Sequence, residues 1–149
     1  MPKRGTLFRT LFHGNINRAK MPRRESHEKA WAAGFFDGEG STHVAWVKAR
    51  KDKDPLCYVQ LSIGQAGPLG GKILSRFGEA ISNLGKLYGP YKPMKHQTLQ
   101  RWCYEVNGLE KILTALWYLW PWLSDVKRQQ ATLNIRKHIE CRLPDKKNR

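Results

Sequence analysis

The chain of 149 residues has the length of one ordinary domain, and 27 lysines and arginines against 12 acids give it a formal net charge of +15. A hydrophobic content of 40% with 11% aromatic residues excludes a disordered chain and is enough to bury a core. The longest apolar run, Leu116 to Leu123, contains Pro121 and is too short to cross a bilayer, so we expect no membrane partner.

The first part of the chain differs from the rest in charge and pattern. Residues 1–27 are strongly basic, hold the single acid Glu25 and have little periodicity, which predicts a flexible basic N-terminal arm. Ser26 is a suitable cap for a helix over 28–37, which Gly38 and Gly40 would end. We therefore expect one folded domain over 28–143, followed by a basic C-terminal tail over 144–149.

Hydrophobic periodicity predicts the other elements of this domain. Alternating residues over 42–50 and 57–64 indicate two strands, and the charged turn 51–55 would join them as a hairpin. A helix follows over 68–84, then strands over 86–92 and 99–106, then helices over 109–120 and 124–141, the last capped by Ser124. The expected fold class is α+β, with a helix-hairpin-helix-hairpin-helix-helix core, a four-stranded antiparallel sheet and the helices on one face.

The other face of this sheet is expected to be polar. Such a face is most often merely solvated, but the positive charge favours a nucleic-acid partner, and a twisted antiparallel sheet fits the DNA major groove. The candidate DNA-binding residues are His43, Tyr58, Gln60, Ser62, Lys86, Tyr88, Lys92 and Arg101. The tryptophans after residue 116 could be a base-stacking platform, but their helical spacing favours core packing.

The cysteines and histidines give little sign of a metal or disulfide site. Cys57, Cys103 and Cys141 are few and form no CxxC pair, which favours a reducing compartment over a disulfide framework or a zinc ribbon. The histidines have no metal-ligand spacing, and we interpret each as a surface or DNA-facing side chain; they are His13, His27, His43, His96 and His138.

The end of the first predicted helix is unusual. One face of it, at spacings of three and four, consists almost wholly of tiny residues and ends in an acid: Ala30, Ala33, Gly34, Asp37 and Gly38. Because glycine destabilises a helix by about 1 kcal/mol relative to alanine, such a face is typical of a close approach by another backbone. A second copy of this helix would bring the acids Asp37 and Glu39 of two chains together, where Mg²⁺ or another divalent cation would neutralise them. The alternative is a glycine-rich turn with solvated acids.

This segment, Ala32 to Gly40, resembles the LAGLIDADG motif of homing endonucleases, with Ala33-Gly34, Asp37 and Gly40 matching and Glu39 in place of the second aspartate. The element order over 28–143 agrees with that family. A single motif implies a homodimer that meets through the tiny-residue face. The resemblance further implies an intron-encoded, site-specific endonuclease that cuts a long, roughly palindromic double-stranded DNA site by metal-dependent phosphodiester hydrolysis.

The resemblance also implies roles for single residues. Glu39 would bind the metal with help from the carbonyl of Gly38, and Asp37 would stabilise the helix end and the interface, with a lesser part in catalysis. Gln65 would order the waters of the active site and Lys127 would stabilise charge on the phosphate. The family has a further basic residue shortly after the glutamine, which is missing here; Lys72 or Arg76 could replace it.

Two other functions remain open on the sequence. A non-cleaving relative, such as an intron RNA maturase or a DNA-binding regulator, would have the same charge and sheet, and RNA would be a partner of the maturase. An RNA binder of ribosomal type would explain the charge but not the tiny-residue helix that ends in acids. The host compartment is open between a bacterial or phage cytoplasm and an organelle.

Overall fold

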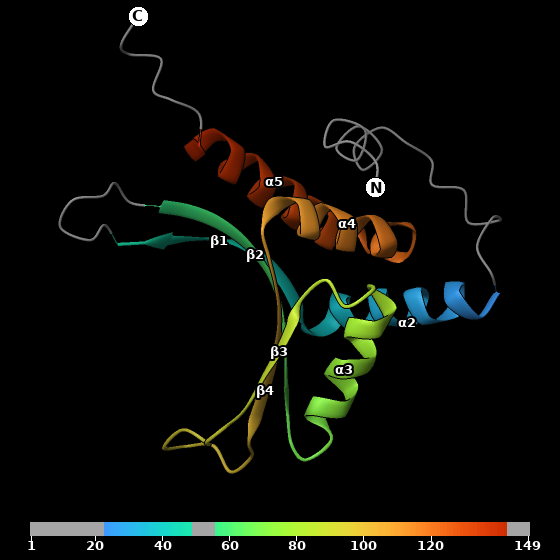
Figure 1. Ribbon diagram of the computed structural model, residues 1–149, viewed down its shortest axis with the longest axis vertical. Coiled ribbons are helices and arrows are strands. Elements are labelled where there is room, and N and C mark those ends of the chain that lie inside the picture. The colour runs from blue at the N-terminus through green and yellow to red at the C-terminus, as the bar shows by residue number, and fades with distance from the viewer. Residues whose placement is uncertain (1–22, 49–55, 143–149) are drawn as a thin grey trace, which may run out of the picture.

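A computed structural model describes residues 23–48 and 56–142 of the chain. The predicted turn 51–55, the tail 144–149 and most of the predicted arm lie outside the described residues. The elements, labelled as in Figure 1, are α2 (Arg23–Glu39), β1 (Gly40–Val47), β2 (Leu56–Ala66), α3 (Gly70–Ala80), β3 (Lys86–Tyr91), β4 (Arg101–Asn107), α4 (Leu109–Leu119), the 3₁₀ turn η2 (Trp120–Trp122) and α5 (Asp125–Arg142).

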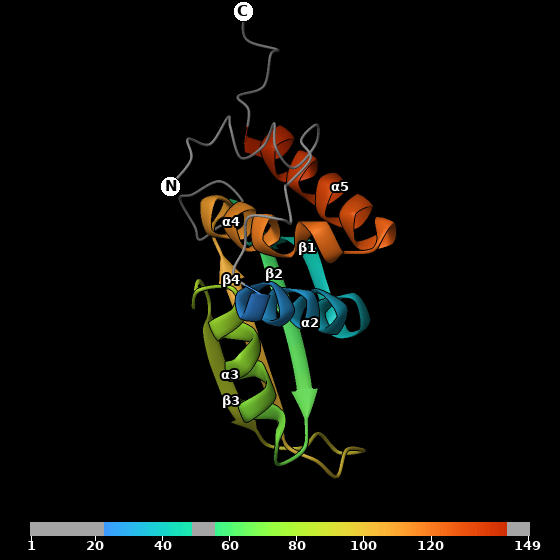
Figure 2. The same cartoon turned by 90° about the vertical axis from the view of Figure 1, so that its right-hand side faces the viewer.

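The strands form one antiparallel, four-stranded sheet in the order β1-β2-β4-β3. Each hairpin therefore supplies one outer and one inner strand, and β2 pairs with β4 at the centre. The helices lie on one side of the sheet, and the other side is uncovered and curves away from them (Figures 1 and 2). The predicted α+β class, element order and sheet are confirmed.

The core lies between the sheet and the helices. Phe77 of α3 stacks on Phe36 of α2 with the ring centroids 6.2 Å apart, and it meets Tyr104 of β4 edge-on at 5.7 Å. All three side chains are at most 3% exposed. The tryptophans of α4 and η2 pack against this core, which confirms the packing role predicted for them. None of the helices in the described ranges is long and apolar enough to span a membrane.

Two helices differ in length from the prediction. The first, α2, begins at Arg23 rather than at 28, so Ser26 lies inside the helix and does not cap it. The added turn is fixed by Lys29, which is 3% exposed, pairs with Glu25 and lies over the ring of Tyr118. The second, α3, is shorter than predicted because Ser82 adopts a φ of 59°, a left-handed conformation that ends the helical path.

The prediction that the cysteines form no disulfide is wrong for Cys57 and Cys141. Cys57 of β2 and Cys141 of α5 form a disulfide across 84 residues of sequence, and Cys103 is free. His138 is also not a surface side chain, because it is 9% exposed with its Nδ1 3.8 Å from the sulfur of Cys57. The two cysteines lie far apart in the sequence, and only the packing of α5 on β1 and β2 brings them together.

Candidate active site and nucleic-acid interface

The turn from α2 into β1 presents Glu39 to solvent. Glu39 is the last residue of the helix and is exposed, whereas Gly40, the first residue of the strand, is buried. A Cβ atom on Gly40 would overlap the ring of Phe36, so only glycine allows the strand to start this close to the helix. The buried glycine therefore fixes where the carboxylate of Glu39 stands.

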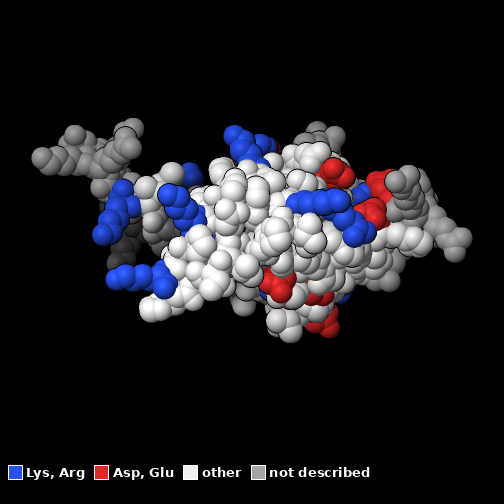
Figure 3. Space-filling model, turned by 90° about the horizontal axis from the view of Figure 1, so that it is seen from below, with Lys and Arg blue, Asp and Glu red and all other residues white. Residues whose placement is uncertain are grey.

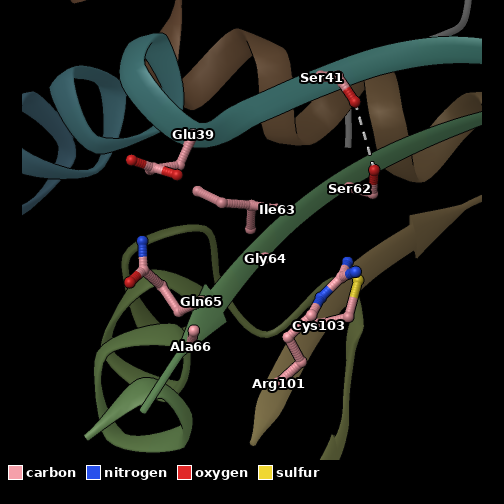
Figure 4. A pocket seen from close by; sticks show the side chains of 9 residues that line it. All are labelled: Glu39, Ser41, Ser62, Ile63, Gly64, Gln65, Ala66, Arg101 and Cys103. Carbon is pink, nitrogen blue, oxygen red and sulfur yellow. Dashed lines mark hydrogen bonds between the residues drawn. The ribbon is translucent and has the colours of Figure 1, made fainter. Parts of the chain in front are cut away.

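Glu39 and Gln65 line one open pocket of about 500 Å³ (Figure 4). Gln65 stands near the end of β2, and its side chain extends toward the end of α2. The guanidinium of Arg101 enters from β4 beside Gly64. The remaining lining residues are Ser41, Ser62, Ile63, Ala66 and Cys103. The acid Glu39, the amide Gln65 and the permanent cation Arg101 thus line the same open pocket.

Lys127 lies next to this pocket but is not among its lining residues. Its ammonium group donates a hydrogen bond to the carbonyl of Gly40 and lies 5.7 Å from the centre of the Phe36 ring. The residue belongs to the first turn of α5, where the resemblance places it. The positive charge of Lys127 is therefore held at Gly40, the residue that follows Glu39 in the sequence.

The carboxylate of Asp37 is committed to the N-terminus of α5. It accepts hydrogen bonds from the backbone N–H of Ser124 at 3.0 and 3.2 Å and from the Ser124 hydroxyl at 2.9 Å. The Ser124 oxygen in turn accepts the N–H of Lys127 at 3.3 Å, which confirms Ser124 as the cap of this helix. Asp37 thus joins α2 to α5 and does not line the pocket.

The tiny-residue face is only partly open. Gly34 and Gly38 are exposed, and a Cβ atom on either would meet nothing within 4 Å, so this side of α2 is free in the single chain. Ala30 and Asp37 are half-buried. Ala33 is 0% exposed and belongs to the core, so its predicted place in a dimer interface is wrong. The spacing identifies one helix face but does not reveal how far α3, α4 and the sheet cover it.

The basic residues proposed to complete the pocket lie elsewhere. Arg76 donates two hydrogen bonds of 2.9 Å to Glu28 and covers the ring of Trp31 at 3.9 Å, which leaves its guanidinium occupied. Lys72 is exposed on α3 and does not line the pocket. Arg101, which the sequence places among the DNA contacts, is the basic residue that lines it.

The sheet register places the predicted DNA contacts on one face, because paired residues in an antiparallel sheet point to the same side. Between β1 and β2, the pairs on this face are His43–Gln60, Ala45–Tyr58 and Ser41–Ser62. The register of β2 with β4, and of β4 with β3, places Arg101, Lys86 and Tyr88 on the same face. Lys92 lies just beyond β3 and is exposed. On this side of the molecule, at the left of Figure 3, the charged side chains in view are basic, whereas the acids in view lie toward the helices.

Three further residues of β4 lie on this face and are not among the predicted DNA contacts: Cys103, Glu105 and Asn107. They alternate with the buried Tyr104 and Val106, so the period of two was available as a signal. Burial raises the pKa of the Cys103 thiol, and the negative charge of Glu105 raises it further. Cys103 is therefore a neutral thiol at pH 7.

The fold is that of known nucleases, although no family model and no curated protein matches the sequence. The homing endonuclease I-CvuI in complex with its target has a TM-score of 0.63 at 23% identity over 80% of this chain and 70% of that chain. The LAGLIDADG homing endonuclease I-GzeII in complex with its DNA target has a TM-score of 0.60 at 19% identity over 79% and 38%. The group I intron-encoded homing endonuclease I-CeuI complexed with DNA has a TM-score of 0.56 at 12% identity over 91% and 62%. The four-stranded sheet, the helices on one side of it and the glycine-bearing α2 are thus the fold of the LAGLIDADG homing endonucleases.

Proposed function

We propose that the protein is a site-specific double-strand DNA endonuclease of the homing type, which acts as a homodimer through α2. The observation that carries this proposal is the meeting of Glu39 and Gln65 in one open pocket, beside the side of α2 that Gly34 and Gly38 leave free. A net charge of +15 supports a nucleic-acid partner. The solved structures of similar fold are described as endonucleases in complex with DNA.

The residues at the end of α2 fit a divalent cation. The carboxylate of Glu39 and the carbonyl of Gly38 are hard oxygen donors of the kind that Mg²⁺ prefers. In the described part of the chain, Asp37 and Glu39 do not belong to a group of three metal-ligating side chains. One chain therefore offers an incomplete metal site. A second chain would add its own Glu39. When bound there, a divalent cation would activate a water and stabilise the leaving oxygen.

The residues around the pocket have separate roles in this proposal. The amide of Gln65 orients the attacking water. The ammonium of Lys127 and the guanidinium of Arg101 stabilise negative charge that develops on the phosphate. Asp37 acts as a positioning residue, because its carboxylate holds the α5 helix that carries Lys127.

The proposed dimer sets the shape of the target. A two-fold axis through α2 would place two uncovered sheet faces along one DNA duplex, so the site would be long and roughly palindromic. The exposed polar residues of β1, β2, β3 and β4 would lie in the major groove of each half-site.

The test is cleavage of a supercoiled DNA library that carries candidate intron-insertion sequences, with Mg²⁺ present. The wild-type protein should linearise one site, and EDTA should stop the reaction. Glu39→Gln should bind that site but cut it at least about 100-fold more slowly, the range seen when a charge-stabilising group is lost. Glu79→Gln removes an exposed acid from α3 and serves as the matched control.

Two outcomes would contradict the proposal. Tight binding of a selected site without cutting by any divalent cation would identify a non-cleaving relative, such as a maturase if RNA is bound or a regulator if DNA is bound. Cleavage at the wild-type rate by Glu39→Gln would remove Glu39 from the reaction.

A further inference from the structure

Glu105 of β4 is a negatively charged residue on the uncovered face of the sheet. The four strands contain a single acid, and that acid lies on the uncovered face that we propose contacts DNA. Its Cα partners are Ser62 on β2 and Lys86 on β3. A carboxylate directed at a phosphate backbone would be repelled, so Glu105 does not serve as a phosphate contact on this face.

The side chain of Glu105 is held in place by its neighbours on the sheet. The amide nitrogen of Gln60 donates to one carboxylate oxygen at 3.2 Å, and it also donates to Asn107 Oδ1 at 2.9 Å. The thiol of Cys103 donates to the other carboxylate oxygen at 3.7 Å. The ion pairs found in the described ranges do not include Glu105, although Lys86 is in register with it.

This arrangement leaves acceptor capacity on a fixed, half-buried carboxylate. A carboxylate has about four lone-pair positions, and its two neighbours use two of them. Since it is acceptor-only when ionised, it can recognise only a group that donates. The floor of the DNA major groove has two such groups, the amino groups of cytosine and adenine, whereas guanine and thymine present acceptors there.

Cytosine fits better than adenine. The adenine amino group stands beside the N7 acceptor, to which a carboxylate cannot donate, whereas the cytosine edge carries no such acceptor. We propose that Glu105, oriented by Gln60, is a specificity-determining residue that accepts a hydrogen bond from the amino group of one cytosine in each half-site. This inference rests on the proposed function, since it requires the sheet to lie in the major groove.

The experiment is a selection of bound and cleaved sites from a randomised DNA library, with full-length wild-type protein and Glu105→Gln. The wild type should require cytosine at one position of each half-site, by roughly tenfold or more over other bases. The glutamine variant should lose that requirement at that position alone and prefer adenine, because its amide both donates and accepts. Glu105→Ala should lose the cytosine preference without acquiring another.

A second measurement separates base recognition from a structural role. Removal of a negative charge from the DNA face should strengthen binding to unrelated DNA, whereas a damaged sheet would weaken binding to every sequence. Glu79→Gln makes the same change in net charge away from the sheet and should keep the wild-type site preference.

The possible failures can be told apart. A wild-type protein that selects no site overturns the proposed function, and this inference with it. A wild-type protein that selects and cuts a site, with the same base preferences in Glu105→Gln, overturns the role of Glu105 and leaves the endonuclease proposal standing.

Discussion

The carboxylate of Asp37 turns away from the pocket and holds the first residues of α5, so its loss should act on stability. Asp37→Ala removes three hydrogen bonds to Ser124 and should lower the free energy of unfolding by about 1–2 kcal/mol in urea denaturation. Asp125→Ala is the control, because that acid is exposed and its ion pair with Arg128 contributes about 0.5 kcal/mol or less. Equal losses in both variants would show that the hydrogen bonds from Ser124 to Asp37 do not stabilise the fold.

His138 should make stability depend on pH. Burial lowers the pKa of its imidazole below the ordinary value of 6.5, and the positive charge of Arg142 lowers it further. The unfolded chain therefore takes up a proton at a higher pH than the folded chain, so stability is full above pH 6.5 and falls as the pH drops through that value. Denaturation between pH 8 and 5.5 should show a smaller loss for His138→Gln than for the wild type, and parallel losses would refute this.

Burial on one face only explains why the sequence predicts the strands better than the start of α2. The strands over 42–47 and 57–64 alternate because helices cover one face only, so their period of two is visible and both strands are found. The helix start at Arg23 is hidden, because it depends on the burial of Lys29 against Tyr118 of α4.

The candidate site likewise contains residues that the sequence predicts and contacts that it does not. Glu39, Gln65 and Lys127 follow from the resemblance, because each stands at a fixed place at the end or start of an element. The burial of Ala33 and the hydrogen bonds of Glu105 depend on which elements pack together, and no local spacing records that.

The disulfide joins the far end of α5 to the start of β2, and its removal should destabilise this pair of elements. Closure of a loop across 84 residues limits the unfolded chain, and the loop-entropy account gives about 4.5 kcal/mol for it. A reductant should therefore lower the urea midpoint of the wild type, and Cys141→Ser should reproduce that midpoint without a reductant. Cys103→Ser should leave the response to reductant intact; a wild type indifferent to reductant would show that the bond is absent in solution.

A substitution at Gly34 should affect the proposed dimer without affecting the folding of the single chain. A side chain at this position meets nothing in the single chain, and leucine favours a helix more than glycine does, so Gly34→Leu should be at least as stable as the wild type. Two α2 helices could no longer approach closely, so the variant should sediment as a monomer and fail to cut DNA. Ser75→Leu, on the exposed side of α3, should sediment like the wild type. A dimeric Gly34→Leu would place the contact between chains elsewhere.

The disulfide between Cys57 and Cys141 closes one covalent ring that contains β2 from Cys57 onward, α3, β3, β4, α4 and nearly all of α5, whereas α2 and β1 lie outside it. The exposed stretch 92–100 between β3 and β4 lies inside this ring and contains Lys95. A protease that cuts there opens the backbone without releasing a fragment. The disulfide keeps the two pieces covalently joined, with Glu39 and Lys127 on opposite sides of the break, until a thiol reagent reduces it.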